Sequence, residues 1–281
     1  MVIGTVYALM GLGLTLIFGV MRVVNFAQGE FYMLGGYTAF YLITLAGVPW
    51  YLAIPLAMGI TFAAGVAAEA LLLRPTHDPK RPVEKPLEYA LITTFALSVL
   101  MQKGALLLFG PFFKRPPDYS TMAVDLPFLY LESSLTVAVV ASVPLILATT
   151  LLVGRTWRGR SWRALAQSQE AAKLMGVNVS KESTLAFGFS CALAAAAGAL
   201  MAPVVLLSPN MGASALIKGY EIIAIGGLGS IPGSLAGGIL LGVVETVGSA
   251  FVSGAYRDVV GFAVLILFLL VRPRGLFGQE A

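Results

Sequence analysis

Charged residues are scarce in this chain. Only 11% of its 281 residues are Asp, Glu, Lys or Arg, whereas 58% are apolar, and the mean hydropathy is +0.88. A soluble domain carries about 25% charged residues because its whole surface faces water. The deficit excludes a soluble fold and indicates a helical membrane protein, which needs polar residues mainly at the ends of its spans.

Cysteine and histidine each occur once. The lone Cys191 excludes an intrachain disulfide, and the lone His77 leaves little material for a histidine-based metal site or catalytic triad. The sequence also lacks GxxxxGK(S/T), HExxH and GxSxG, the patterns of P-loop nucleotide hydrolysis, zinc proteases and serine hydrolases. We therefore expect no enzymatic activity, no cofactor and no metal site in this chain.

Long apolar runs fill most of the sequence, and a helix needs about 20 residues to cross the hydrocarbon core. The runs lie at roughly 2–21, 31–46, 50–73, 88–109, 131–153 and 184–207, followed by a more broken region at 217–271. They predict an all-α, polytopic transmembrane bundle of about eight spans that forms a single domain over residues 1–281. The stretch 217–228 is too short to span and runs into GGLGSIPGS. We expect a broken or re-entrant segment near 217–233, with a plain surface turn as the alternative.

The basic residues gather at the ends of the apolar runs. They concentrate in 74–87, in 154–183 and after residue 271, which is typical of cytoplasmic membrane loops. The net charge of +4 is therefore attributed to membrane topology, with the lipid bilayer as the partner and no nucleic acid. The positive-inside rule places these segments in the cytoplasm, the C-terminus inside and the N-terminus outside.

The basic loop 154–183 reads GRTWRGRSWRALAQSQEAAKLMGVNVSKES and is patterned as a short amphipathic helix. One predicted face carries Trp162, Leu165, Ala172 and Met175, with Gln169 interrupting it. Gly176 is placed to end the helix in a left-handed conformation. The pattern favours a docking helix for a soluble partner. A helix lying on the lipid headgroups is a compatible alternative.

Polar residues meet at the junction of the first two spans, where NFAQGE contributes Asn25, Gln28 and Glu30. A carboxylate near a helix N-terminus is favoured by the helix dipole. Capping and packing are favoured here over substrate contact.

The glycines of GGLGSIPGSLAGGILLG recur every four residues at Gly229, Gly233 and Gly237. Small residues at that spacing predict a close helix contact. Glu245 lies centrally in the run 234–253, where a charge is costly. We expect it to face the protein interior or an aqueous path, with protonation or pairing with Lys103 as alternatives.

Three segments of the chain resemble the permeases of branched-chain amino-acid ABC importers of the LivH type. They are GTVYALMGLGLTLIFGVMRVVNFAQGEFYMLGGY, GGLGSIPGSLAGGILLGVVE and the terminal RPRGLFG. EAAKLMG is similar to the core of the importer coupling loop. Among its departures from the family, Gln28 stands where the family often has His, and the longer ending of the general importer loop is missing after Gly176.

The resemblance implies the permease subunit of an ATP-driven importer in the plasma (inner) membrane. Such a subunit would carry branched-chain amino acids (leucine, isoleucine, valine) or related amino acids. Two cytoplasmic ATPase subunits, a second permease subunit (a paralogue or a second copy) and an external substrate-binding protein are its implied partners. The segment 154–183 becomes the coupling loop, with contacts at Trp162, Leu165, Glu170, Ala171, Ala172, Met175 and Gly176. Pathway or gate packing is assigned to Asn25, Gln28, Glu30, Gly229, Gly233 and Glu245.

Two other functions remain open at this point. A permease of a urea or short-chain amide importer would look alike. A stand-alone secondary transporter or channel would need no ATPase, and we would expect it to show inverted repeats and more paired intramembrane charges.

Overall fold

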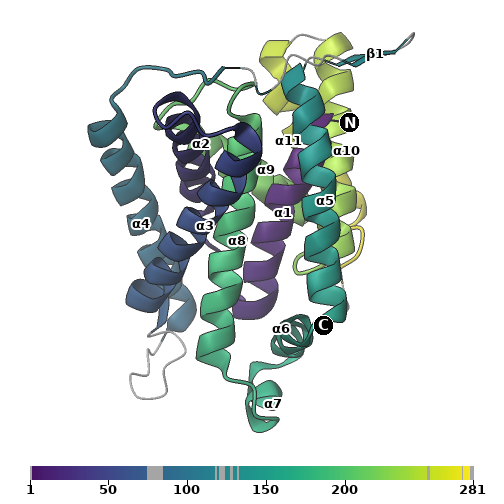
Figure 1. The fold of residues 1–281 in the computed structure, drawn as a ribbon. Helices are drawn as coiled ribbons and strands as arrows, with labels where there is room; N and C mark the ends of the chain where they lie inside the picture. The colour runs from purple at the N-terminus through teal and green to yellow at the C-terminus, as the bar shows by residue number, and fades with distance from the viewer. Residues whose placement is uncertain are drawn as a thin grey trace.

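The structure is a computed structural model that describes residues 2–74, 85–117, 119, 124–126, 129–131, 133–251, 254–273 and 275–278. Long helices run side by side in one bundle (Figure 1). The α helices of these residues are α1 (Val2–Met21), α2 (Gln28–Thr44), α3 (Trp50–Ala68), α4 (Pro86–Phe109), α5 (Ser133–Arg155), α6 (Trp157–Gln167), α7 (Gln169–Leu174), α8 (Val179–Met201), α9 (Met211–Gly226), α10 (Ile231–Phe251) and α11 (Arg257–Val271). The expected all-α transmembrane architecture is confirmed.

Short elements complete the described fold. A π-helical turn (Glu69–Leu73) extends α3, and a 3-10 turn (Gly254–Tyr256) precedes α11. The strands β1 (Val124–Leu126) and β2 (Leu129–Leu131) pair antiparallel as a small hairpin. The two ends of the bundle differ: α6 and α7 lie at one end with the carboxyl end of the chain, and the N-terminus lies at the opposite end (Figure 1).

Six of these helices are long and apolar enough to cross a membrane. They are α1, α3 with its π turn, α4, α5, α8 and α10. The helices α2, α9 and α11 have 17, 16 and 15 residues, less than the about 20 that a full span needs. In place of about eight spans, the described residues contain six helices of full spanning length and three shorter ones.

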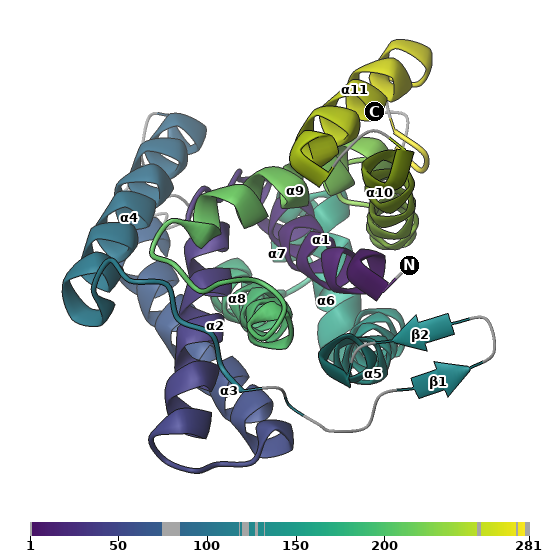
Figure 2. The ribbon, with the colours of Figure 1, turned by 90° about the horizontal axis from the view of Figure 1, so that it is seen from above.

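The helix α8 forms the centre of the bundle, with α1, α2 and α3 around it (Figure 2). Of the most apolar stretch of α8, 83% is buried inside the protein, whereas the corresponding share of α4 is 11%. Small residues bring α2 and α8 together: a Cβ added to Gly198 would lie 1.9 Å from the carbonyl oxygen of Tyr32. The contact distance is fixed by backbone atoms, so this seam tolerates no larger residue.

Glycines also join α10 to two neighbours. A Cβ on Gly233 would lie 2.1 Å from the carbonyl oxygen of Gly226 in α9, and one on Gly242 would lie 2.4 Å from the Cα of Gly4 in α1. The close contact predicted for the glycine repeat is present at Gly233. Gly229 lies outside the helix, in the turn before α10, with φ +80°.

The expected break near 217–233 falls between α9 and α10. Gly227, with φ +99°, ends α9, and four residues later α10 begins. Seen along the bundle, α9 runs across it from beside α2 toward α10 and α11 (Figure 2). This short crossing helix brings residues from α2, α1, α10 and α11 into one neighbourhood.

Candidate functional site

The first unusual feature is the position along α1 at which the neighbouring helix α2 begins. The side-chain amide of Gln28 donates to the carbonyl oxygen and to Oγ of Ser190, at 3.1 and 3.0 Å. Ser190 Oγ in turn donates to the carbonyl oxygen of Gly13, at 2.6 Å. Gly13 lies in the middle of α1, so the chain returns from the end of α1 to mid-helix before α2 starts. The junction expected at the end of two spans is therefore a broken segment inside the bundle.

The side chains of Asn25 and Gln28 form the hydrogen bonds within this break. Asn25 Oδ1 accepts a hydrogen bond from the amide of Ala27 at 3.0 Å, and Asn25 Nδ2 donates to Gln28 Oε1 at 3.1 Å. Both side chains are fully buried. Neither caps α2, whose N-cap, Ala27, has no side-chain hydrogen bond. Of the two expected roles, packing is present at these residues and helix capping is not.

Glu30 lies two residues after Gln28, in the first turn of α2, and is buried against α4. Ser98 Oγ donates to its Oε1 at 3.2 Å, and Oε2 has no hydrogen-bond partner among the described residues. Gly212 at the start of α9 packs against the carboxylate, since a Cβ there would lie 2.8 Å from Oε2. Glu30 thus lies where α2, α4 and α9 meet.

Replacing Gln28 tests whether the break depends on these hydrogen bonds. We expect Gln28→Leu to lower the free energy of unfolding by about 1–3 kcal/mol, because Asn25 Nδ2 loses its acceptor in a buried site. Thermal unfolding of the purified protein in detergent measures the effect. Gln102→Leu, on the half-buried surface of α4, is the matched control and should change the melting temperature little. Equal shifts in the two variants would contradict a structural role for Gln28.

A buried ionic network lies where α9, α10 and α11 meet. Lys218 Nζ lies 2.6 Å from Glu245 Oε1, 3.1 Å from Asp258 Oδ1 and 3.4 Å from Glu221 Oε2. Arg257 Nε lies 2.8 Å from Glu245 Oε2, and the Tyr7 hydroxyl donates to the same oxygen at 3.1 Å. Burial makes the stability of the folded protein depend on every member of such a network, because a buried charge without a partner costs free energy.

Glu245 faces the protein interior, as expected, but its cations are Lys218 and Arg257. Pairing with Lys103 is wrong: that lysine is exposed on α4. Sequence reasoning missed Lys218, whose side chain is 9% exposed. The feature of the sequence that could have revealed it is a single lysine within the apolar stretch of α9, three residues before Glu221.

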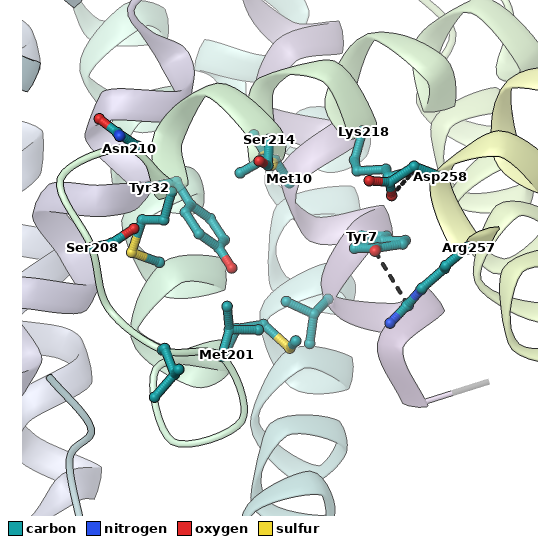
Figure 3. Close-up of a pocket in the computed structure, with 15 residues that line it drawn as sticks. Tyr7, Met10, Tyr32, Met201, Ser208, Asn210, Ser214, Lys218, Arg257 and Asp258 are labelled. Atoms are coloured by element: carbon teal, nitrogen blue, oxygen red, sulfur yellow. Dashed lines mark hydrogen bonds and ion pairs between the residues drawn. The ribbon is translucent and has the colours of Figure 1, made fainter. Parts of the chain in front are cut away.

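A cavity of about 370 Å³ adjoins this network at the N-terminal end of α1. Residues of α1, α2, α8, α9, α11 and the segment between α8 and α9 line it. Lys218, Asp258, Tyr7 and Arg257 lie on one side of the space, and Tyr32, Met201 and Ser208 lie on the other (Figure 3). Its location is opposite to α6 and α7 along the bundle.

At that other end, the expected single loop helix is two helices, because the chain breaks at Ser168. This residue is extended (φ −158°, ψ 118°), and its hydroxyl accepts a hydrogen bond from the amide of Ala171 as the N-cap of α7. Gly176 follows α7 with φ +86°, which confirms the left-handed ending.

The residues proposed for coupling separate into two groups. Trp162, Leu165 and Ala172 are buried, and the Trp162 ring packs 5.9 Å from that of Phe189 in α8. Glu170, Ala171, Met175 and Gly176 are exposed. Met175 and its neighbour Leu174 are 85% and 88% exposed. The predicted apolar face therefore mostly faces the bundle, and the exposed surface is the tip of α7.

Hydrogen bonds attach this helix pair to the ends of α1 and α5. Arg22 donates to the carbonyl oxygens of Ala166 and Gln167, at 3.2 and 3.0 Å. The Gln169 amide donates to the carbonyl oxygen of Val20 at 3.0 Å, and Arg163 donates to carbonyl oxygens at the end of α5. Both α6 and α7 are thus hydrogen-bonded to the end of α1.

The turn between α9 and α10 also reaches this end. A second cavity, of about 450 Å³, is lined by Arg22, Arg163, Gly229, Pro232 and Phe277 among others. The carboxyl tail closes the turn: the amides of Leu276 and Phe277 donate to the last carbonyl oxygens of α9, at 2.8 and 3.0 Å.

Six helices long and apolar enough to cross a membrane define a multi-pass membrane protein. The chain belongs to the family of branched-chain amino acid transport system permease components, whose family model matches residues 1–269.

Curated relatives agree with the family over almost the full chain. The branched-chain amino acid transport system permease protein BraD of Pseudomonas aeruginosa is 33% identical, covering 99% of this chain and 93% of its own length. LivH of Salmonella typhimurium is 34% identical, covering 99% and 92%. The permease LivM of the same species is 26% identical over 96% of this chain and 67% of its own length. No solved structure matches the chain.

Proposed function

We propose that this permease carries branched-chain amino acids through the membrane within an ATP-driven importer. The relatives BraD and LivH are named as permeases of high-affinity branched-chain amino acid transport systems. The similarity to LivM supports a second, related permease subunit beside this one. ATP hydrolysis is assigned to two separate cytoplasmic subunits, and substrate delivery to an external binding protein.

The observation that carries this proposal is the exposed tip of α7. Leu174 and Met175 are large apolar side chains exposed to 88% and 85%, at the end of a helix pair in which Trp162, Leu165 and Ala172 are buried. The segment 154–183 holds six of the basic residues that the positive-inside rule assigns to the cytoplasm. We therefore place α7 on the cytoplasmic side, where an ATPase groove would hold its tip.

Coupling then follows from the contacts of the helix pair. When the ATPases close, α7 moves with them, and the hydrogen bonds of Arg22 and Gln169 pull on the end of α1. The helix α1 packs on α8 and α10, so its displacement shifts the equilibrium between outward-facing and inward-facing arrangements. Gly229 and Gly233 lie in the turn and helix start that this motion reaches, and Asn25, Gln28 and Glu30 hold the α1–α2 break.

The tip is tested by giving it charge. We expect the double variant Leu174→Asp and Met175→Asp to abolish ATP-driven leucine uptake and co-purification of the ATPase, because the carboxylates cannot enter an apolar groove. The measurement is uptake of radiolabelled leucine by proteoliposomes that contain the complete assembly. Trp157→Asp is the matched control, because Trp157 is 73% exposed at the start of α6. Unchanged uptake in the tip variant, or leucine transport by this chain alone without ATP, would contradict the proposal.

A further inference from the structure

The cavity at the N-terminal end of α1 has the size of a small-molecule site. Its volume is about 370 Å³, within the range of about 300–1,000 Å³ that such sites occupy. Most of the lining area belongs to apolar side chains, which include Val6, Met10, Met201, Val205, Leu206 and Met211. A cavity of this kind gains affinity by removing an apolar group from water.

Charges of both signs are confined to one side of this cavity. Lys218, Arg257 and Asp258 line it together (Figure 3). The network behind them contains three carboxylates and two cations, since Glu221 and Glu245 add to Asp258. Asp258 is 72% exposed and pairs with Lys218 alone among the described residues, so its second oxygen can accept a ligand's ammonium group.

One polar group reaches into the cavity from α2. The ring of Tyr32 is 8% exposed and extends into the space toward Met201 and Tyr7 (Figure 3). Its hydroxyl forms no hydrogen bond to any described residue. Because Tyr32 lines the cavity, its hydroxyl can form a hydrogen bond to a ligand.

We propose that the cavity is a binding site within the permease for a zwitterionic α-amino acid with an apolar side chain. An apolar amino acid carries both charges on one carbon and a hydrocarbon group on the other side. This distribution matches the cavity, with Asp258 facing the ammonium, Arg257 facing the carboxylate, and the methionines around the side chain. The proposal rests on the proposed function and adds a substrate site between the binding protein and the pathway.

Cysteine labelling can test this site because the single native cysteine, Cys191, is fully buried. Ser214 lines the cavity, and Ser214→Cys changes its volume little. Ala213, the preceding residue, is also exposed but does not line the cavity, so Ala213→Cys is the matched control. Each variant is assembled with the partner permease and the ATPases in nanodiscs, without nucleotide and without the binding protein, and the maleimide labelling rate of this chain is measured.

We expect leucine to slow labelling of the Ser214→Cys variant and to leave the Ala213→Cys variant unchanged. At about ten times its dissociation constant, leucine should slow the reaction about tenfold, because only the empty fraction reacts. Isovalerate and isoamylamine, which each lack one of the two charges, should protect far less at the same concentration.

Three results would overturn the site: no protection by leucine in an assembly that transports it, equal protection of both variants, or equal protection by isovalerate and leucine. ATP-driven uptake by the wild-type assembly with its binding protein is measured in the same preparation. If that uptake is absent, the proposed function fails and the site loses its substrate with it. If uptake is intact and protection is absent, the site alone is refuted.

Discussion

Replacing Lys218 by methionine should lower the free energy of unfolding by about 3–5 kcal/mol, the usual cost of removing one partner from a buried ion pair. Lys218 faces three carboxylates, and without it Arg257 is the one remaining cation of the network. Glu221 then has no ion-pair partner among the described residues, because Lys218 is its cation. The midpoint of thermal unfolding in detergent measures the loss.

Two further variants separate charge from packing at this position. Lys103→Met removes an exposed lysine from α4 and should leave the melting temperature nearly unchanged. The double variant Lys218→Met and Glu221→Met should recover part of the stability, because it removes the carboxylate that the first change leaves unpaired. If Lys218→Met and Lys103→Met melted alike, the network would not hold α9 to α10 and α11.

The second large effect is expected at the seam between α2 and α8. We expect Gly198→Leu to destabilise the protein by more than about 3 kcal/mol and to prevent its accumulation in membranes, because overpacking that cannot relax exceeds the usual cost. The added Cβ would lie 1.9 Å from a backbone oxygen of Tyr32, and no rotamer change removes that clash. Membrane yield and detergent melting temperature are the measurements.

A glycine of the same bundle provides the control for this substitution. Gly59 of α3 has no atom within 4 Å of an added Cβ, so Gly59→Leu should accumulate like the wild type. Gly198→Ala should lie between the two, because it introduces the same Cβ without the rest of the side chain. Normal accumulation of Gly198→Leu would show that α2 and α8 separate easily.

Local patterns in the sequence predict the spans and the break well. Apolar runs locate the long helices, and the glycines of GGLGSIPGS predict the interruption that Gly227 and Gly229 make with positive φ. Gly176 is placed correctly because a left-handed residue after a helix is a local requirement. The end of α6 was also readable, since Ser168 has the residue type of an N-cap, but the amphipathic pattern favoured one continuous helix.

The rest depends on contacts between distant parts of the chain. The helix α2 begins beside the middle of α1 because Gln28 forms a hydrogen bond to Ser190, 162 positions away. The residues around Gln28 do not predict this contact. The cations of Glu245 were missed for the same reason: Lys218 and Arg257 are brought together by the course of α9 across the bundle. Burial of Trp162 and Leu165 likewise depends on where the bundle lies, which amphipathicity alone cannot tell from a docking surface.

The bonding of the carboxyl tail to α9 makes the turn after that helix depend on a distant part of the chain. The terminal carbonyl groups of a helix need donors from elsewhere, and here the amides of Leu276 and Phe277 supply two of them. A truncation before Leu276 would leave both carbonyl groups without these donors and would loosen the corner formed by α9, α10 and α11.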